Sequence, residues 1–201
     1  NQKADSDFLV FDEADGDPVL ACALTDVAIA QQAYSFEIKA TGGPDGYAAF
    51  YLPEGLDVDL DTGMVTGTPP TAGDFRIPLM VTYADGTSIG RPPSSPEEVY
   101  EEGTDLIVLE LTVEATDPVI LTKDATGAAA TTVNLNGQVT DSGGDFPDIF
   151  AYYGQSDGGS DPSAWDTIEL LDIAGTVDVD GNFAEGIGNL EPGKTYYYRF
   201  L

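Results

Sequence analysis

Carboxylates are the residues whose number and spacing in this sequence could do chemistry. The 201 residues include 36 Asp and Glu against 7 Lys and Arg, which gives a formal net charge of −29. Clustered oxygen ligands bind hard cations such as Ca²⁺, so acidic clusters are candidate calcium sites. The clusters are Asp12, Glu13, Asp15 and Asp17; Asp57, Asp59 and Asp61; and Asp178, Asp180 and Asn182. None of them completes an EF-hand loop.

Calcium is expected above all where two predicted modules join. The predicted ligands are Asp15 and Asp17 before one junction, and Glu114 and Asp117 at the next. An ion held there would clamp neighbouring domains, which gives it a mechanical purpose. Ca²⁺ is the one cofactor that the sequence suggests.

A simpler interpretation applies to the acidic residues at 57, 59 and 61. They alternate with Leu56, Val58 and Leu60. Strict alternation is typical of a strand with one solvated face, so these three apolar residues are predicted to point inward.

The residue types exclude most catalytic classes. There is no histidine and one cysteine, so Ser-His-Asp or Cys-His catalysis, an imidazole metal site and an intrachain disulfide are impossible. The acidic surface would repel nucleic acid, and no apolar run approaches the roughly 20 residues that a membrane helix needs. A glycosidase needs an acid of raised pKa in a sheltered cleft, which small tandem sandwiches seldom provide. We therefore predict a protein that is not an enzyme.

Aromatic residues offer a second kind of site. Tyr152, Tyr153, Trp165 and Tyr197 could form a platform on which sugars stack, although such residues more often form sandwich cores and cross-strand pairs. Cys22 lies in an apolar segment and is most simply a small buried residue.

The elements that position these residues are organised around a repeated junction. Asp17-Pro18-Val19-Leu20 recurs as Asp117-Pro118-Val119-Ile120, at an offset of 100 residues. Asp-Pro favours an extended connection, and the apolar residues after it predict a first strand. The predicted organisation is an N-terminal strand segment at 1–17, one domain at 18–116 and a second at 117–201.

Short apolar runs separated by Gly and Asp turns predict the secondary structure. The segment 21–33 is interpreted as extended rather than helical because it contains Val27 and Ile29. Many short strands indicate an all-β fold, specifically two tandem immunoglobulin-like β-sandwiches. The expected strands cover residues 34–40, 56–60, 75–83, 106–113, 131–139, 149–153, 167–173 and 195–201.

Residues 18–116 carry a specific motif progression. It consists of Leu52-Pro53-Glu54-Gly55-Leu56, then Thr62-Gly63-Met64-Val65-Thr66-Gly67-Thr68-Pro69, then Ala72-Gly73. This progression resembles the immunoglobulin-like repeats of large bacterial surface and secreted proteins. The resemblance implies a sandwich module and an extracellular or cell-surface location. The pattern departs at 87–104, which is rich in Pro and Glu and is interpreted as a mobile acidic loop excursion.

Residues 118–201 end in Leu190-Glu191-Pro192-Gly193-Lys194-Thr195-Tyr196-Tyr197-Tyr198-Arg199. This ending is similar to the E–F corner and F strand of fibronectin type III modules. The resemblance implies that Leu190 and Tyr196 pack the corner, with Tyr198 on the same face and Tyr197 on the other. It also implies a further G strand, which is not found before Leu201.

The segment before the first junction could supply that strand. The 84 residues after Asp117 and the 17 before Pro18 together approach the 100-residue spacing of the junctions. Phe8-Leu9-Val10-Phe11 would then be a G strand that pairs beside Tyr196, Tyr198 and Phe200. It could belong to a neighbouring module of a tandem array, or it could be donated between separate chains and build a head-to-tail filament.

The sequence thus favours a structural or adhesive module of an extracellular bacterial surface protein or filament. Its partners would be neighbouring modules or copies of itself. The alternative is an accessory carbohydrate-binding module of a secreted polysaccharide-degrading enzyme, with polysaccharide as the partner.

Overall fold

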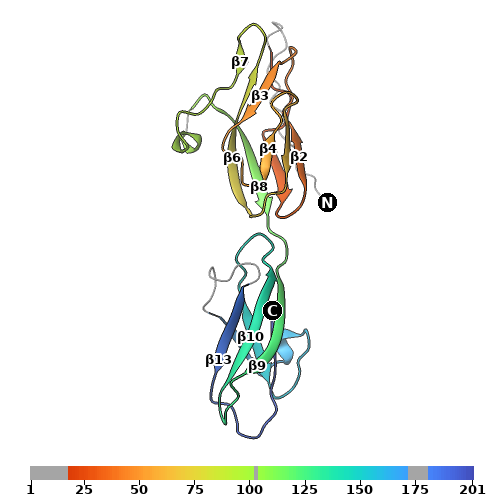
Figure 1. Cartoon of the computed structure of the whole chain (residues 1–201), viewed down its shortest axis with the longest axis vertical. Helices are drawn as coiled ribbons and strands as arrows, with labels where there is room; N and C mark the ends of the chain where they lie inside the picture. The colour runs from red at the N-terminus through yellow and green to blue at the C-terminus, as the bar shows by residue number, and fades with distance from the viewer. Residues whose placement is uncertain (1–17, 102–103, 172–180) are drawn as a thin grey trace. The chain divides into compact units, whose positions relative to one another are not determined.

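The computed structural model describes residues 18–101, 104–171 and 181–201 (Figure 1). Strands dominate, and the chain divides into two compact units between Ala115 and Thr116. Each unit contains separate sheets around its own apolar core, which confirms the predicted all-β, immunoglobulin-like sandwich class. Among the described residues, no helix is long and apolar enough to span a bilayer.

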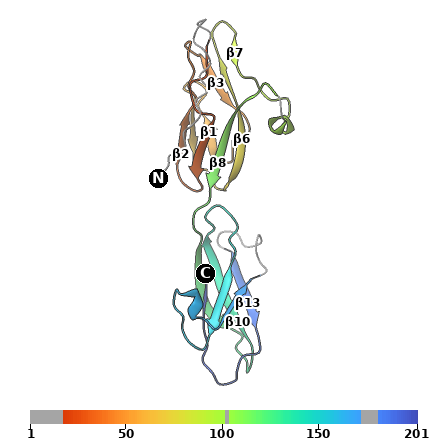
Figure 2. The same cartoon turned by 180° about the vertical axis from the view of Figure 1, so that it is seen from behind.

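The first unit has two sheets, which Figures 1 and 2 show from opposite sides. The first sheet has the order β1 (Thr25–Ile29), β8 (Ile107–Glu114), β6 (Gly73–Thr82), β3 (Gly46–Ala49), and β7 (Ser88–Ile89) also pairs with β6. The second has the order β2 (Tyr34–Glu37), β5 (Met64–Gly67), β4 (Leu56–Val58). The β1–β8 pair is parallel, whereas the other described pairs are antiparallel.

Alternation along β6 and β8 creates the core of this unit. Their inward residues are buried, namely Ile77, Leu79, Val81, Leu109, Leu111 and Val113. Their outward residues form polar pairs: Arg76 lies 3.3 Å from Glu110, and the Thr112 hydroxyl donates to Asp74 at 2.8 Å. The outer sides of β6 and β8 therefore carry polar and charged pairs, while Val27 and Ile29 of β1 are exposed beside them.

Two motif glycines meet where β4 and β5 pair. Gly55 and Gly67 both have positive φ, at 80° and 145°. A Cβ on Gly67 would lie 1.9 Å from the Gly55 carbonyl oxygen, so a side chain cannot be accommodated there. The spacing of the LPxGL and TGxxxGTP motifs thus allows two backbones to approach closely.

The second unit has two sheets of three antiparallel strands. One has the order β13 (Asn182–Ile187), β10 (Val133–Asp141), β9 (Val119–Thr126), and the other β12 (Thr167–Leu170), β11 (Phe150–Gly154), β14 (Tyr197–Phe200). A single 3₁₀ turn, η3 (Pro162–Ala164), precedes β12. Phe183 and Phe200 meet edge to face in the core, with ring centroids 4.8 Å apart. Gly137 provides their space, since a Cβ there would lie 2.3 Å from the Phe183 ring.

The acidic excursion contains local structure that its composition did not predict. β7 and the 3₁₀ helix η2 (Glu97–Tyr100) lie in it (Figure 1). Val99 of η2 is buried. Arg91 holds the segment together by ion pairs to Glu98 and Asp105. The hydrogen bonds from Arg91 and the Ser94 N–H lower the pKa of Glu98 to about 2.

Several strands differ from the sequence-based expectation. The segment 21–33 contains the strand β1 rather than a helix, as predicted, and turns at residues 30–32, whereas β3, β5, β7 and β13 were not among the expected strands. The prediction that Leu60 points inward is wrong: β4 ends at Val58, so Leu60 lies in the following turn and is 60% exposed. Leu56 and Val58 do pack against the core.

Candidate functional site

The strand β14 has one edge without a partner strand among the described residues. It pairs with β11 on its other side. Phe150 and Leu201 exchange both backbone hydrogen bonds, at 2.9 and 3.1 Å. Hydrogen-bonded pairs alternate in an antiparallel ladder, so Tyr198 and Phe200 turn their N–H and C=O groups away from β11. The edge therefore offers backbone groups at two alternate residues.

A side chain of β9 covers one of these groups. The Phe200 N–H donates to the Thr122 hydroxyl at 3.1 Å. The Tyr198 hydroxyl crosses to the same strand and donates to the Lys123 carbonyl. Side-chain contacts thus link β14 to β9, although the two strands belong to different sheets.

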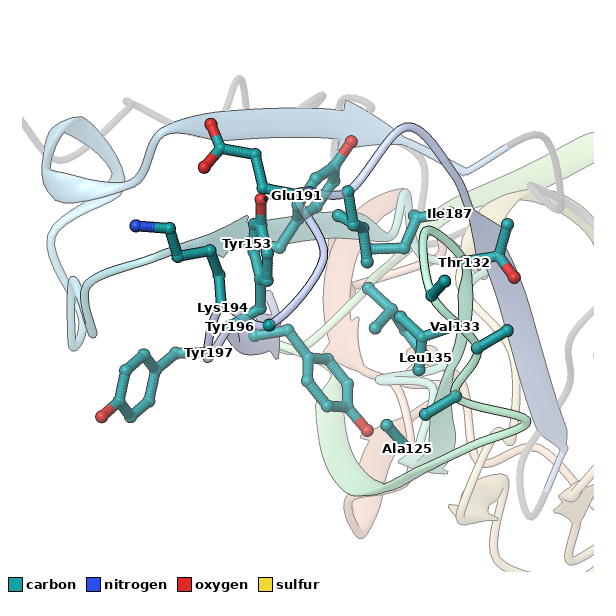
Figure 3. Close-up of a pocket in the computed structure, with 16 residues that line it drawn as sticks. Ala125, Thr132, Val133, Leu135, Tyr153, Ile187, Glu191, Lys194, Tyr196 and Tyr197 are labelled. Atoms are coloured by element: carbon teal, nitrogen blue, oxygen red, sulfur yellow. Dashed lines mark hydrogen bonds between the residues drawn. The ribbon is translucent and has the colours of Figure 1, made fainter.

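A cavity of about 250 Å³ lies beside the start of β14. Its lining comes from the end of β9, the loop after it, β10 and the segment that leads into β14. Figure 3 shows Val133, Leu135 and Ile187 grouped on one side, while Lys194 and Glu191 direct their charged ends away from them. The interior of the cavity is therefore mainly apolar, and its charges lie at the rim.

The corner before β14 is built as predicted. The Glu191 N–H donates to the Tyr196 hydroxyl at 3.1 Å, and Leu190 packs against the core. Tyr198 is half-buried, and burial raises the pKa of its hydroxyl, whereas Tyr197 is 45% exposed on the other face. The corner holds the first residues of β14 in place beside the cavity.

The outer face of the β12–β11–β14 sheet is apolar. The cross-strand register sets Phe150 opposite Leu170 and Tyr152 opposite both Ile168 and Arg199. Arg199 has no acidic partner within 4.0 Å among the described residues. We use the name outer apolar face for Phe150, Ile168, Leu170, Tyr197 and Leu201, of which the last four are exposed.

The residues predicted to bind calcium are not brought together among those described. Asp15 and Asp17, like the predicted strand Phe8–Phe11, lie outside the described residues. Glu114 ends β8 and is exposed, as is Asp117. Within the described ranges, no three acidic, Cys or His side chains group as metal ligands. Calcium binding stays a prediction.

One acidic cluster has a local structural role. The Asp59 carboxylate accepts hydrogen bonds from the N–H groups of Asp61 and Thr62, at 3.0 and 2.9 Å. The backbone bond from Thr62 is the larger cause of the lowered pKa of Asp59. This carboxylate therefore caps the turn after β4.

The alternative of a sugar-stacking platform is not supported for Trp165 and Tyr152, which are buried as the favoured interpretation expected. Trp165 and Tyr152 are 7% and 8% exposed, and the Trp165 indole N–H donates to the Gly159 carbonyl at 3.3 Å. Tyr153 and Tyr197 both line the cavity, and of the four residues Tyr197 alone is a large exposed aromatic residue, with 45% exposure. Cys22 is half-buried, and burial raises the pKa of its thiol.

Sequence reasoning missed Thr122 and the cavity. Nothing in the sequence distinguishes Thr122 from other threonines in strands, because its partner, the Phe200 N–H, is 78 residues away. Lys194, at the rim of the cavity, could have been singled out from the sequence, because it follows Pro-Gly in the predicted corner. The cavity could not, because its lining comes from segments far apart in the chain.

Comparisons with known proteins support part of the family prediction. Residues 18–93 match a family model described as "Putative Ig domain", so the first unit contains an Ig-like module. The resemblance of the second unit to fibronectin type III modules stays a prediction. No curated protein matches the sequence.

Two solved structures from Bacteroides fragilis NCTC 9343 are similar over part of the chain. They are named as a putative alpha-galactosidase/melibiase and a putative alpha-galactosidase, with 20% and 22% identity and a TM-score of 0.38 each. Each match covers 48% of this chain and 17% of the enzyme. At this TM-score, neither likeness bears on the activity of this chain.

Proposed function

We propose that this chain is a structural module of an extracellular bacterial surface protein or filament, and that it joins copies of itself by strand addition at β14. The observation that carries the proposal is the edge of β14 that has no partner strand among the described residues. Tyr198 and Phe200 direct backbone hydrogen-bonding groups outward there. Such an edge pairs readily with an extended segment from another chain.

The donor in this proposal is the segment Phe8–Phe11 of another copy. Donor and acceptor are then different segments of the chain, so the contact is heterologous, that is, head to tail. Unless its rotation happens to close a ring, such a contact propagates into a filament. A net charge of −29 would oppose assembly at low ionic strength, whereas screening in salty surroundings would permit it.

Two observations support a structural rather than a catalytic role. Residues 18–93 match an Ig-like family model, and the sequence contains no histidine for acid–base catalysis. The alternative role in carbohydrate binding is less favoured, because Trp165 and Tyr152 are buried and cannot stack against a sugar ring.

Deleting residues 1–11 tests the proposal. The full chain should form polymers whose length grows with protein concentration, as measured by analytical ultracentrifugation and electron microscopy in high salt. The deletion variant should stay monomeric, because it lacks the donor. A control that lacks only residues 1–5 keeps Phe8–Phe11 and should assemble like the full chain. Polymers of the 1–11 deletion, or a full chain that stays monomeric, would contradict strand donation.

A further inference from the structure

The cavity beside β14 is large enough to receive a side chain. Its volume is about 250 Å³, whereas an apolar cavity of about 150 Å³ already accommodates benzene. Ala125 of β9, Leu135 of β10 and Tyr198 of β14 line it, so it lies between the two sheets next to the partnerless edge. Phe200 does not line it. The space is therefore confined to the Tyr198 end of β14.

The ladder geometry determines which residues of an added strand could enter this space. Directly opposite residues in an antiparallel pair point to the same face of the sheet. Tyr198 and Phe200 belong to the core side, as their packing with the buried cluster shows. Strand residues opposite these two would point inward, and residues opposite Arg199 and Leu201 would lie on the outer side.

The composition of the proposed donor fits an edge with apolar surface on both sides. Phe8-Leu9-Val10-Phe11 is a continuous apolar run and does not alternate, which is typical of strands covered on both faces. At β14 the cavity lies on the inner side and the outer apolar face on the other. The charges of donor and edge are also opposite. Asp12 follows the run, and Arg199 of β14 has no acidic partner among the described residues.

We infer that the cavity is the acceptor for the Phe11 side chain of a second copy, whose donor strand runs antiparallel to β14. This inference rests on the strand addition proposed above. Phe11 lies opposite Tyr198 and Leu9 opposite Phe200, while Val10 and Phe8 lie opposite Arg199 and Leu201. The antiparallel direction is favoured because every described strand pair in the second unit is antiparallel. In this direction, Phe11, the last residue of the donor run, lies at the Tyr198 end of β14.

Single substitutions in the full chain test the direction of the donor strand and which of its residues point inward. Phe11→Ala should raise the concentration at half-assembly by about a hundredfold, because it empties a buried aromatic site. Phe8→Ala, the matched control, should raise it by less than about tenfold, because its side chain lies on the outer face. An equal or larger effect of Phe8→Ala would overturn the inferred strand direction. The proposed function would still stand if deleting residues 1–11 abolished assembly.

A second pair of variants tests the acceptor. Ala125→Leu fills the cavity and should block assembly as strongly as Phe11→Ala does. The control Ala184→Leu lies on β13, outside the cavity lining, and should assemble normally. Mixing the Phe11→Ala and Ala125→Leu variants should yield heterodimers that do not grow, since each retains one intact half of the contact. Normal polymers of Ala125→Leu, or no complex in the mixture, would contradict the assignment of the cavity.

Discussion

The last strands of the two units are completed differently. In the first unit, β8 lies between β6 and β1, and β1 pairs with it in parallel from Thr25 opposite Glu110 to Ile29 opposite Glu114. In the second unit, β14 pairs with β11 alone among the described strands, and the first strand β9 pairs with β10 in the other sheet. Among the described strands, the first strand therefore pairs with the last one in the first unit but not in the second.

The leading segment of each unit explains the difference. In the first unit it pairs at Leu20 with Ala40, bends, and then continues as β1 beside β8. In the second unit β9 runs from Val119 to Thr126 along β10, with register shifts but without changing sheets. In the first unit, the change of sheet is what brings the leading segment beside β8.

The outer sides of the last strands, β8 in the first unit and β14 in the second, also differ. Glu110, Thr112 and their partners on β6 make the outer side of β8 polar. Tyr197 and Leu201 continue an apolar face on the outer side of β14. Val27 and Ile29 of β1 are also exposed beside the polar residues of β8, so exposed apolar surface, which is typical of an interface, is not confined to the second unit.

The largest expected effect tests whether the two units are stabilised independently. Leu109→Ala empties a fully buried position on β8 and should lower the free energy of unfolding of the first unit by about 2–5 kcal/mol. Calorimetry should show this loss in one transition only, with the transition of the second unit unchanged. Glu110→Gln, on the solvent side of the same strand, should have little effect. A shift of both transitions would show that the units are coupled.

Gly137→Ala should produce the corresponding loss in the second unit. The added Cβ would collide with the Phe183 and Phe200 rings, and overpacking of this kind costs about 1–3 kcal/mol. Denaturant unfolding monitored by near-UV circular dichroism measures the change. Gly186→Ala on β13 is the control, because its nearest atom would be 3.4 Å away. Equal stability of the two variants would show that the aromatic pair is not tightly packed against β10.

Thr122→Val should separate stability from assembly. Losing the hydroxyl that accepts the Phe200 N–H should destabilise the isolated second unit by about 0.5–1.5 kcal/mol. It should also lower the concentration at half-assembly, because an added strand no longer competes with Thr122 for that donor. Thr112→Val on the paired strand β8 should cost similar stability without changing assembly. Weaker assembly of Thr122→Val would mean that Thr122 helps to hold the edge open.

The smallest expected effect concerns the acidic excursion, which belongs to the first unit. The pKa of Glu98 is lowered from 4.5 to about 2, so its stabilising effect is complete above the ordinary value and is lost as the pH falls toward about 2. A carboxyl titration by NMR should detect this pKa. Arg91→Gln should raise it toward the ordinary value, whereas Arg76→Gln, elsewhere in the unit, should not. An unchanged pKa in Arg91→Gln would leave the ordering of the excursion unexplained.

Local sequence signals predicted the strands with strong patterns. The β-branched and alternating runs around 75–83 and 106–113 correspond to β6 and β8, because period-two alternation directly reflects one buried face. β3 and β13 were missed, since Gly-Tyr-Ala-Ala and Asn-Phe-Ala-Glu-Gly-Ile contain few residues with high strand propensity. Their strand character comes from pairing with longer neighbours.

The sequence by itself determined the all-β class, the positions of most strands, the motif glycines and the corner at Leu190 and Tyr196, because each depends on residues close together in the chain. Only the tertiary structure decided the pairing of β1 with β8, the partnerless edge of β14 and the cavity beside it. Thr112 and Thr122 are both threonines in strands, but their hydroxyls differ in role. The Thr112 hydroxyl donates to Asp74, whereas the Thr122 hydroxyl accepts the Phe200 N–H at the edge of β14. Edges and cavities arise from pairings between residues far apart, and local patterns do not specify which strands become neighbours.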